Sequence, residues 1–286
     1  MSLLKDLREL TKPSITRMNV LMALGGYALA GGSFRPVVVG AAMAGTALAV
    51  MSANTLNQYL ERDIDGRMAR TANRPLVRDR MLPRTALWFG IVMGILSTAI
   101  LFALVNTVTA ALGLFALLSY VLVYTPLKQK TPLSLVIGAV PGAIPPLMGW
   151  TAATGAIDPA GLALFGILLV WQLPHFLAIS MYRFDDYARA GFKTVPVVRG
   201  DKVAKAQAVA WSTALVPISL SLLPLGVAGW FYGAVALGLG VWFLVWSLRG
   251  LRADAGVAWA RGFFLYSIAY LPALVAALAV DVTLLA

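Results

Sequence analysis

Residues 37–65 read VVVGAAMAGTALAVMSANTLNQYLERDID, and this stretch decides how the chain folds. Residues 37–60 contain no charged side chain, and a bilayer-spanning helix needs roughly 20 mostly apolar residues. The run then ends in a cluster of acidic and basic side chains. This pattern predicts a helix that crosses a membrane and carries ionisable groups to one membrane edge.

The rest of the chain has the same character. Of its 286 residues, 60% are hydrophobic and 12% are charged, whereas a soluble domain usually has about 25% charged residues. We therefore expect one all-α, polytopic membrane domain over 1–286 and not a water-soluble protein. Nine transmembrane helices are expected, at about 15–32, 37–60, 86–105, 108–124, 133–153, 160–181, 206–228, 230–248 and 262–281.

The basic residues give this arrangement an orientation. With nine spans, all of the 23 lysines and arginines except Arg35 fall on one side. The positive-inside rule makes that side cytoplasmic, which predicts a cytoplasmic N-terminus and an outside C-terminus in the cell (inner) membrane. Two long charged loops, about 61–85 and 182–205, lie on this side. The net charge of +11 is then explained by anionic lipid and does not require nucleic acid as a partner.

The first candidate site lies where the second expected helix ends. If that helix continues, Asn57, Glu61 and Asp65 are four residues apart and share one face, while Asp63 points elsewhere. Carboxylate and amide oxygens of this kind suit Mg²⁺, which usually binds one or two carboxylates together with substrate phosphates. The following arginines, Arg70 and Arg74 among them, match phosphate oxygens. A solvated charged loop is the plainer alternative, but acids that begin inside an apolar helix are costly and usually functional.

Three further stretches could contribute to a site. Asp185 and Asp186, followed by Lys193, repeat the order of acids before bases at the end of another span. Tyr124 and Lys128 stand in the connection on the same side, where they could face a carbocation and a phosphate or merely belong to an ordinary basic loop. The single histidine, His175, follows Pro174 inside an apolar run, so it is either a hydrogen-bonded structural residue or a ligand, with haem iron as one plausible partner.

These residues carry a resemblance. Asn57-xxx-Glu61-xxx-Asp65 with the following RTANRPL (70–76) resembles the first aspartate-rich motif of the UbiA-type membrane prenyltransferases. The stretches RDIDGRMART (62–71), YTPLK (124–128), PPLMGW (145–150), PHF (174–176) and DYARAG (186–191) are similar to the branch of that family that farnesylates protohaem IX. Glu61 stands where the family usually has aspartate; it is one methylene longer and should still ligate a metal.

The resemblance implies nine helices around a central cavity and a transfer of farnesyl from farnesyl diphosphate to a vinyl group of protohaem IX, with water, to give haem O and diphosphate. Mg²⁺ would be held by Asn57, Glu61 and Asp65. The diphosphate would be bound by Arg70, Arg74, Lys128 and Lys193, and the haem by His175. Tyr124 would act beside the reacting carbon, and Asp185 and Asp186 would assist a second metal or order their loop.

The partners implied are farnesyl diphosphate, protohaem IX and the bilayer, with downstream haem-modifying or oxidase-assembly proteins as possible receivers of the product. Two other functions are kept open. One is a UbiA-type prenyltransferase that acts on an aromatic quinone precursor and has the same metal–diphosphate site. The other is a proton- or ion-coupled transporter, which predicts acids near the middle of the bilayer and not at helix ends.

Overall fold

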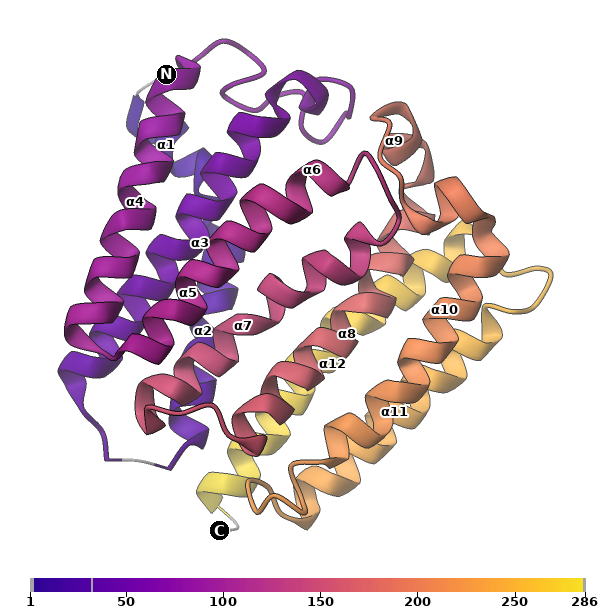
Figure 1. Ribbon diagram of the computed structural model, residues 1–286. Coiled ribbons are helices and arrows are strands. Elements are labelled where there is room, and N and C mark those ends of the chain that lie inside the picture. The colour runs from indigo at the N-terminus through magenta and orange to yellow at the C-terminus, as the bar shows by residue number, and fades with distance from the viewer. Residues whose placement is uncertain (1–2, 32, 285–286) are drawn as a thin grey trace.

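The computed structural model describes residues 3–31 and 33–284, and every regular element within them is a helix (Figure 1). The predicted all-α class is thus confirmed. The helices are α1 (Leu3–Leu10), α2 (Pro13–Leu29), α3 (Pro36–Asp65), α4 (Pro83–Leu104), α5 (Thr107–Leu118), the π-helix η1 (Ser119–Tyr124), α6 (Thr125–Leu127), α7 (Ser134–Thr154), α8 (Pro159–Tyr182), α9 (Phe184–Arg189), α10 (Val195–Leu220), α11 (Trp230–Arg249) and α12 (Val257–Leu284).

Seven helices in the described residues are long and apolar enough to cross a membrane. They are α3, α4, the continuous segment Thr107–Leu127, α7, α8, α11 and α12. The first and seventh expected spans correspond to α2, which has 17 residues, and α10, which begins among charged residues. The nine-span count is therefore approximate, but the arrangement is that of a multi-pass membrane protein.

The seventh expected span differs most from the structure. It was placed at 206–228, whereas α10 begins at Val195 and ends at Leu220, and turns follow it. The N-terminal part of α10 is interrupted at Gly200, whose φ of 80° lies in the left-handed region that glycine adopts without strain. Hydropathy alone did not detect this part, because its residues are charged.

Local sequence signals explain where several helices begin. Proline occupies the first turn of α2, α3, α4 and α8, where its missing N–H costs nothing. Asn106 accepts a hydrogen bond from Thr109 N at 2.8 Å at the start of α5, and Asp158 accepts one from Gly161 N at 2.9 Å at the start of α8. These side chains satisfy backbone donors that the helix itself leaves unpaired.

Glycines allow α2 and α7 to pack closely. A Cβ at Gly149 of α7 would overlap the Ala23 carbonyl oxygen of α2 and lie 2.8 Å from Tyr27 N, and a Cβ at Gly26 would overlap the Pro146 carbonyl. No alanine fits at either position without separating the helices. Small residues at a helix–helix contact are common between membrane helices.

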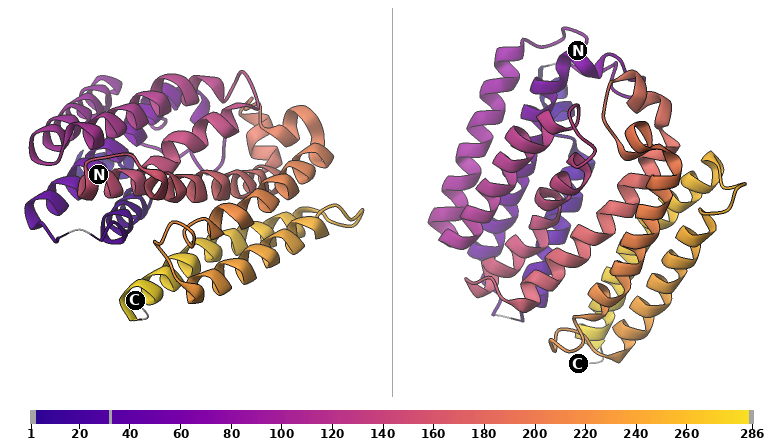
Figure 2. Two further views of the ribbon diagram at one scale, coloured as in Figure 1. Left: turned by 60° about the horizontal axis from the view of Figure 1, so that its bottom comes forward. Right: turned by 45° about the vertical axis from the view of Figure 1, so that its right-hand side comes forward.

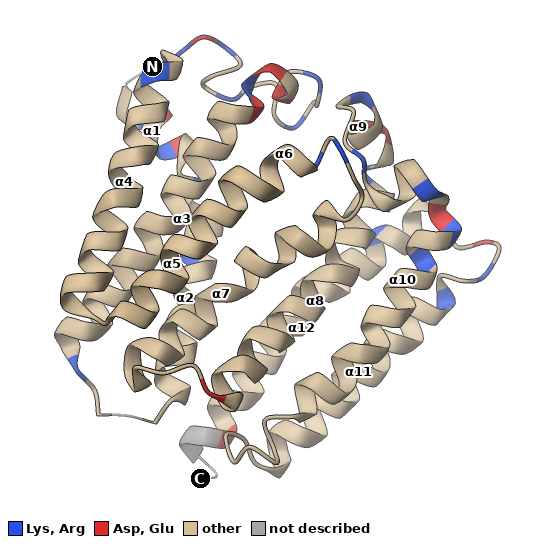
Figure 3. Ribbon diagram, viewed as in Figure 1, with Lys and Arg blue, Asp and Glu red and all other residues tan. Residues whose placement is uncertain are grey.

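The charged side chains gather at one end of the bundle, the end that carries α9 and the loop after α3 (Figure 3). Arg35, the basic residue assigned to the other side, donates to the carbonyl oxygens of Ala152 and Ala153 near the end of α7. The two chain termini lie at opposite ends of the bundle, and α10, α11 and α12 form a group beside the earlier helices (Figure 2). This arrangement agrees with the predicted one-sided distribution of charge.

Candidate active site

The carboxylates of the first motif lie at the C-terminal end of α3. This helix continues through Asp65, so the condition for one shared face is met. Asn57, Glu61 and Asp65 are all buried, whereas the side chain of Asp63 is 81% exposed. Asn57 Nδ2 donates to Thr125 Oγ1 at 3.1 Å, which leaves its amide oxygen for another partner. Helical spacing alone therefore predicted that Glu61 and Asp65 are buried and that Asp63 is exposed.

Basic side chains from two other segments reach these acids. Arg74, in the loop after α3, forms an ion pair with Asp65, and Lys128, after α6, lies 2.5 Å from Glu61 Oε1. Thr71 Oγ1 donates to the Asp65 carbonyl at 2.6 Å, which ties the arginine loop back onto the helix. Two of the four predicted diphosphate-binding residues, Arg74 and Lys128, thus meet the predicted metal ligands.

Lys12 is a third basic residue near this site, and the sequence did not reveal it. It precedes Pro13 at the start of α2 and has a left-handed backbone, with φ of 46°. Burial, then the positive charges of Arg74 and Lys128, lower the pKa of Lys12 from 10.5 to about 7, against the opposing effect of the two carboxylates. A basic residue directly before the helix-starting proline, on the charged side, was the only available signal.

A π-helix shapes the side of the site that carries Tyr124. In η1 the Thr125 hydroxyl donates to the Tyr120 carbonyl at 2.9 Å, and the rings of Tyr120 and Tyr124 lie 5.1 Å apart. Lys128 Nζ is 4.9 Å from the centre of the Tyr124 ring. The extra residue of a π-turn rotates the side chains that follow, and such turns are frequent at functional sites. Here the residues that follow the π-helix, Thr125 and Lys128, contact Asn57 and Glu61 of α3.

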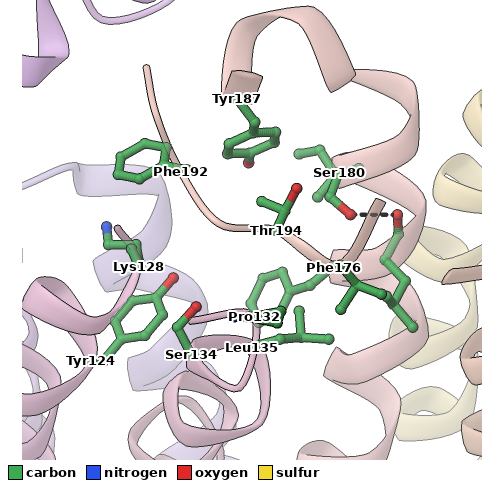
Figure 4. Close-up of a pocket in the computed structure, with 13 residues that line it drawn as sticks. Tyr124, Lys128, Pro132, Ser134, Leu135, Phe176, Ser180, Tyr187, Phe192 and Thr194 are labelled. Carbon is green, nitrogen blue, oxygen red and sulfur yellow. Dashed lines mark hydrogen bonds between the residues drawn. The ribbon is translucent and has the colours of Figure 1, made fainter. Parts of the chain in front are cut away.

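The loop after α3 and the segment 184–194 after α8 meet above this site. Met68 from the first loop packs with Ala190 and Phe192 from the second, and the Arg70 guanidinium lies 5.6 Å from the centre of the Tyr187 ring. Figure 4 shows Tyr187 and Phe192 across a small cavity from Tyr124 and Lys128. The aromatic residues Tyr187 and Phe192 were not predicted as site residues, because nothing in the sequence distinguishes them from loop anchors.

The second predicted acidic motif is placed differently. Asp185 is exposed. Asp186 is buried and pairs with Arg189 at 2.6 Å and Arg183 at 3.9 Å, so its charge is used within its own segment. The Lys193 side chain is exposed, and its backbone N donates to the Lys128 carbonyl at 2.8 Å. These contacts fit the loop-ordering role for Asp186 better than the metal-binding one.

The residues on α3 fit a divalent cation. Asp65 Oδ1 is buried and has no hydrogen-bond partner among the described residues, and burying such an oxygen is costly unless something pairs with it. In the described chain no group of three His, Cys, Asp or Glu side chains is placed to hold a metal. Two carboxylates and an amide would therefore share the ion with substrate oxygens, as Mg²⁺ sites commonly do.

His175 lies apart from the acids, on the side of α8 that faces α12. Its Nδ1 is 2.7 Å from Ser267 Oγ, and its ring is 5.0 Å from those of Trp171 and Phe264. No described contact joins it to Glu61 or Asp65. The predicted haem-binding residue and the predicted metal ligands thus belong to different walls of the helical bundle.

Comparisons with known proteins agree with this architecture. Residues 19–268 match the UbiA prenyltransferase family. The chain is 49% identical, over 96% of its length and 92% of the relative's, to a protohaem IX farnesyltransferase of Anaeromyxobacter sp. (strain Fw109-5). A solved digeranylgeranylglyceryl phosphate synthase superposes with a TM-score of 0.84 at 16% identity, covering 97% of this chain and 98% of the other. A UbiA homologue from Archaeoglobus fulgidus, bound to DMAPP and Mg²⁺, superposes with a TM-score of 0.69 at 17% identity, covering 96% and 99%.

Proposed function

Because the chain belongs to the UbiA prenyltransferase family, we propose that it transfers the farnesyl group of farnesyl diphosphate to a vinyl group of protohaem IX, with addition of water, to give haem O and diphosphate. The observation that carries the reaction type is the cluster of two buried carboxylates paired with Arg74 and Lys128, with Lys12 near them, at the charged end of the bundle. The acceptor is inferred from the protohaem IX farnesyltransferase relative.

The cluster suits a diphosphate leaving group. Asn57, Glu61 and Asp65 would hold Mg²⁺, and the Archaeoglobus fulgidus homologue with bound DMAPP and Mg²⁺ supports this assignment. When bound, Mg²⁺ would offset the negative charge of the diphosphate as its bond to carbon breaks. Arg74, Lys128 and Lys12 would contact the remaining oxygens, with Arg70 and Lys193 at the exposed rim.

The reaction then needs an environment that keeps water from the reactive carbon. The C1–O bond of the farnesyl donor breaks, a C–C bond forms to the vinyl group, and one water molecule supplies the hydroxyl of the product. The faces of Tyr124, Tyr187 and Phe192 carry partial negative charge and line the cavity beside Lys128. They would stabilise positive charge on the allylic carbon, while Asp185 and Asp186 would hold their loop over the cavity.

The apolar tail of the donor has a matching cavity. α2, α8 and α12 line a partly open cavity of about 220 Å³ whose walls are almost entirely apolar side chains, among them Leu21, Met22 and Leu271. Leu21 follows Lys12 by nine residues, which is ~14 Å along a helix. A chain of three isoprene units anchored by its diphosphate near Lys12 would extend toward this cavity.

We place the protein in the cell membrane, with the N-terminus and the two charged loops in the cytoplasm and the C-terminus outside. The carboxylates lie at the end of α3 and not at its middle, which is the position expected for an enzyme that meets a water-soluble diphosphate and not for an ion-conducting path. Downstream haem-modifying or oxidase-assembly proteins would take over the apolar product.

The acceptor is tested by giving the purified full-length protein farnesyl diphosphate and Mg²⁺ with either protohaem IX or 4-hydroxybenzoate. Mass spectrometry should show a farnesylated, hydrated haem and no prenylated benzoate. Prenylation of the benzoate without any haem product would assign the chain to the quinone-precursor alternative.

A further inference from the structure

Ser267 on α12 fixes two aromatic side chains of α8. The Trp171 indole N–H donates to the Ser267 carbonyl at 2.9 Å, and one turn further His175 Nδ1 lies 2.7 Å from the Ser267 hydroxyl oxygen. Ser267 is fully buried. The Trp171 and His175 rings stack with their centres 5.0 Å apart and their planes 22° from parallel. One buried residue therefore sets the position of both rings.

The same contacts fix which nitrogen of His175 carries the proton. The Ser267 hydroxyl lies 2.6 Å from the Phe264 carbonyl oxygen, and a carbonyl cannot donate, so the single hydroxyl proton points there. The hydroxyl oxygen must then accept a hydrogen bond from Nδ1–H. In the neutral ring this leaves the lone pair on Nε2, and Nε2 has no hydrogen-bond partner within the described chain.

The His175 ring is surrounded by aromatic, largely apolar side chains. Phe264 lies 5.0 Å from the imidazole and stacks on Tyr182, with 26° between the two planes. Trp171, His175 and Tyr182 are spaced by four and seven residues along α8 and so share one face. All of these rings are half-buried. An open nitrogen lone pair in apolar surroundings suits a largely apolar ligand that carries a metal.

Two guanidinium groups lie at the charged end of the interface between α8 and α12, which we call the seam. Arg183, which directly follows α8 and also pairs with Asp186 at 3.9 Å, lies 4.6 Å from the centre of the Tyr182 ring. Arg261 of α12 lies 6.0 Å from the same centre. Arg183 follows His175 by eight residues, which is ~12 Å along the helix. Guanidinium groups bind carboxylates through paired hydrogen bonds. The seam therefore offers an iron ligand, aromatic and apolar neighbours and two guanidinium groups for carboxylates, which is the recognition chemistry of an iron porphyrin with two propionates.

We propose that the seam between α8 and α12 binds the haem acceptor, with His175 Nε2 as the ligand of its iron and Ser267 as the residue that positions His175. The inference rests on the proposed function and deepens it. Metal-ligating histidines commonly donate their second ring N–H to a fixed acceptor, and losing that acceptor typically costs 10–100-fold in metal affinity. Ser267 would be that acceptor here.

The experiment titrates purified full-length protein with ferric protohaem IX and, separately, with metal-free protoporphyrin IX, following absorbance and fluorescence. In Ser267→Ala the Kd for haem should rise 10–100-fold, while the Kd for protoporphyrin IX changes less than about twofold. Ser267→Thr, which keeps the hydroxyl, should restore most of the affinity. His175→Ala should lose the imidazole-ligated haem spectrum and regain it when free imidazole is added.

Ser247→Ala is the matched control. Ser247 is equally buried, and its hydroxyl donates to Leu244 O at 2.7 Å in the same three-residue pattern, but on α11. It should bind haem like the wild type. The arginines are tested with haem dimethyl ester: Arg261→Gln should weaken binding of haem but not of the ester. Haem affinity unchanged in Ser267→Ala, or weakened equally for both porphyrins, would overturn the assignment.

The hypothesis that the seam binds haem and the proposed function can be refuted separately, because they predict different results. Farnesylated haem made by a wild type whose His175 and Ser267 variants bind haem normally would refute the seam alone. Haem bound with the expected spectrum, but never farnesylated, would refute the proposed function and leave the seam standing.

Discussion

Gly138 of α7 offers a test of the role of Tyr124 that leaves Tyr124 itself in place. An alanine Cβ at this position would overlap Cε2 and Cδ2 of the Tyr124 ring and lie 2.9 Å from its Cζ. Carbon atoms in favourable contact are about 3.5–4.0 Å apart. The ring must therefore move by roughly 1 Å, away from α7.

The expected effects on stability and on catalysis differ in size. Alanine in a helix is about 1 kcal/mol more favourable than glycine, and a side chain forced about 30° from its rotamer costs about 0.5–1.5 kcal/mol, so the net change in stability should be near zero. A 1 Å misplacement at a reacting centre can cost about 100-fold in rate. Gly138→Ala should thus lower kcat for prenyl transfer by about 100-fold without unfolding the protein.

The assay combines product formation at saturating farnesyl diphosphate with thermal unfolding of the detergent-solubilised protein. Gly40→Ala in α3 is the control, because a Cβ there meets no atom within 4 Å, and it should keep wild-type kcat. A Gly138→Ala enzyme with kcat within about twofold of wild type would show that the position of Tyr124 does not matter. A loss of kcat that follows a loss of folded protein would also refute the reasoning.

Three further predictions follow from the site and the packing. In a double-mutant cycle, the loss in free energy of unfolding caused by Glu61→Gln and Lys128→Met together should be about 1–3 kcal/mol smaller than the sum of the two single losses. Full additivity would mean that the pair at 2.5 Å contributes nothing to stability. Because the pKa of Lys12 is about 7, its side chain is a cation at pH 6 and largely neutral at pH 8. KM for farnesyl diphosphate should therefore rise several-fold over this interval, and Lys12→Arg should flatten the change. An equal rise of KM in both enzymes would exclude Lys12 as a ligand of the diphosphate. Gly149→Ala should lower stability by about 1–3 kcal/mol through overpacking, whereas Gly25→Ala, with nothing within 4 Å, should not; equal unfolding temperatures would contradict the packing of α2 on α7.

Much of the fold could be predicted from the sequence, because length and apolarity dominate helix formation in a membrane. Helical spacing correctly placed Glu61 and Asp65 on one buried face and Asp63 outside it. The same reasoning failed for α10, whose first turns are charged and lie outside any hydropathy peak. Hydropathy and spacing therefore predicted the apolar helix α3 correctly but missed the charged first turns of α10.

The site was predictable only where its residues are local in sequence. Lys12 precedes a different helix, yet the charges of Glu61 and Asp65 act on its pKa, and no spacing rule relates it to Glu61. The π-helix that ends at Tyr124 has no recognisable sequence signal. The pair Asp185-Asp186 resembled a metal motif, but its buried member is neutralised by Arg189 and Arg183 of its own segment, a contact that composition cannot reveal.

The most direct test of the account compares three single variants of α3 in one assay of farnesylated haem, with farnesyl diphosphate, protohaem IX and Mg²⁺ and with mass spectrometric detection. Glu61→Ala and Asp65→Ala should abolish the product, because each removes a buried carboxylate from the metal–diphosphate site. Asp63→Ala, on the same helix but exposed, should retain it. Product formation that survives in both Glu61→Ala and Asp65→Ala would contradict the account.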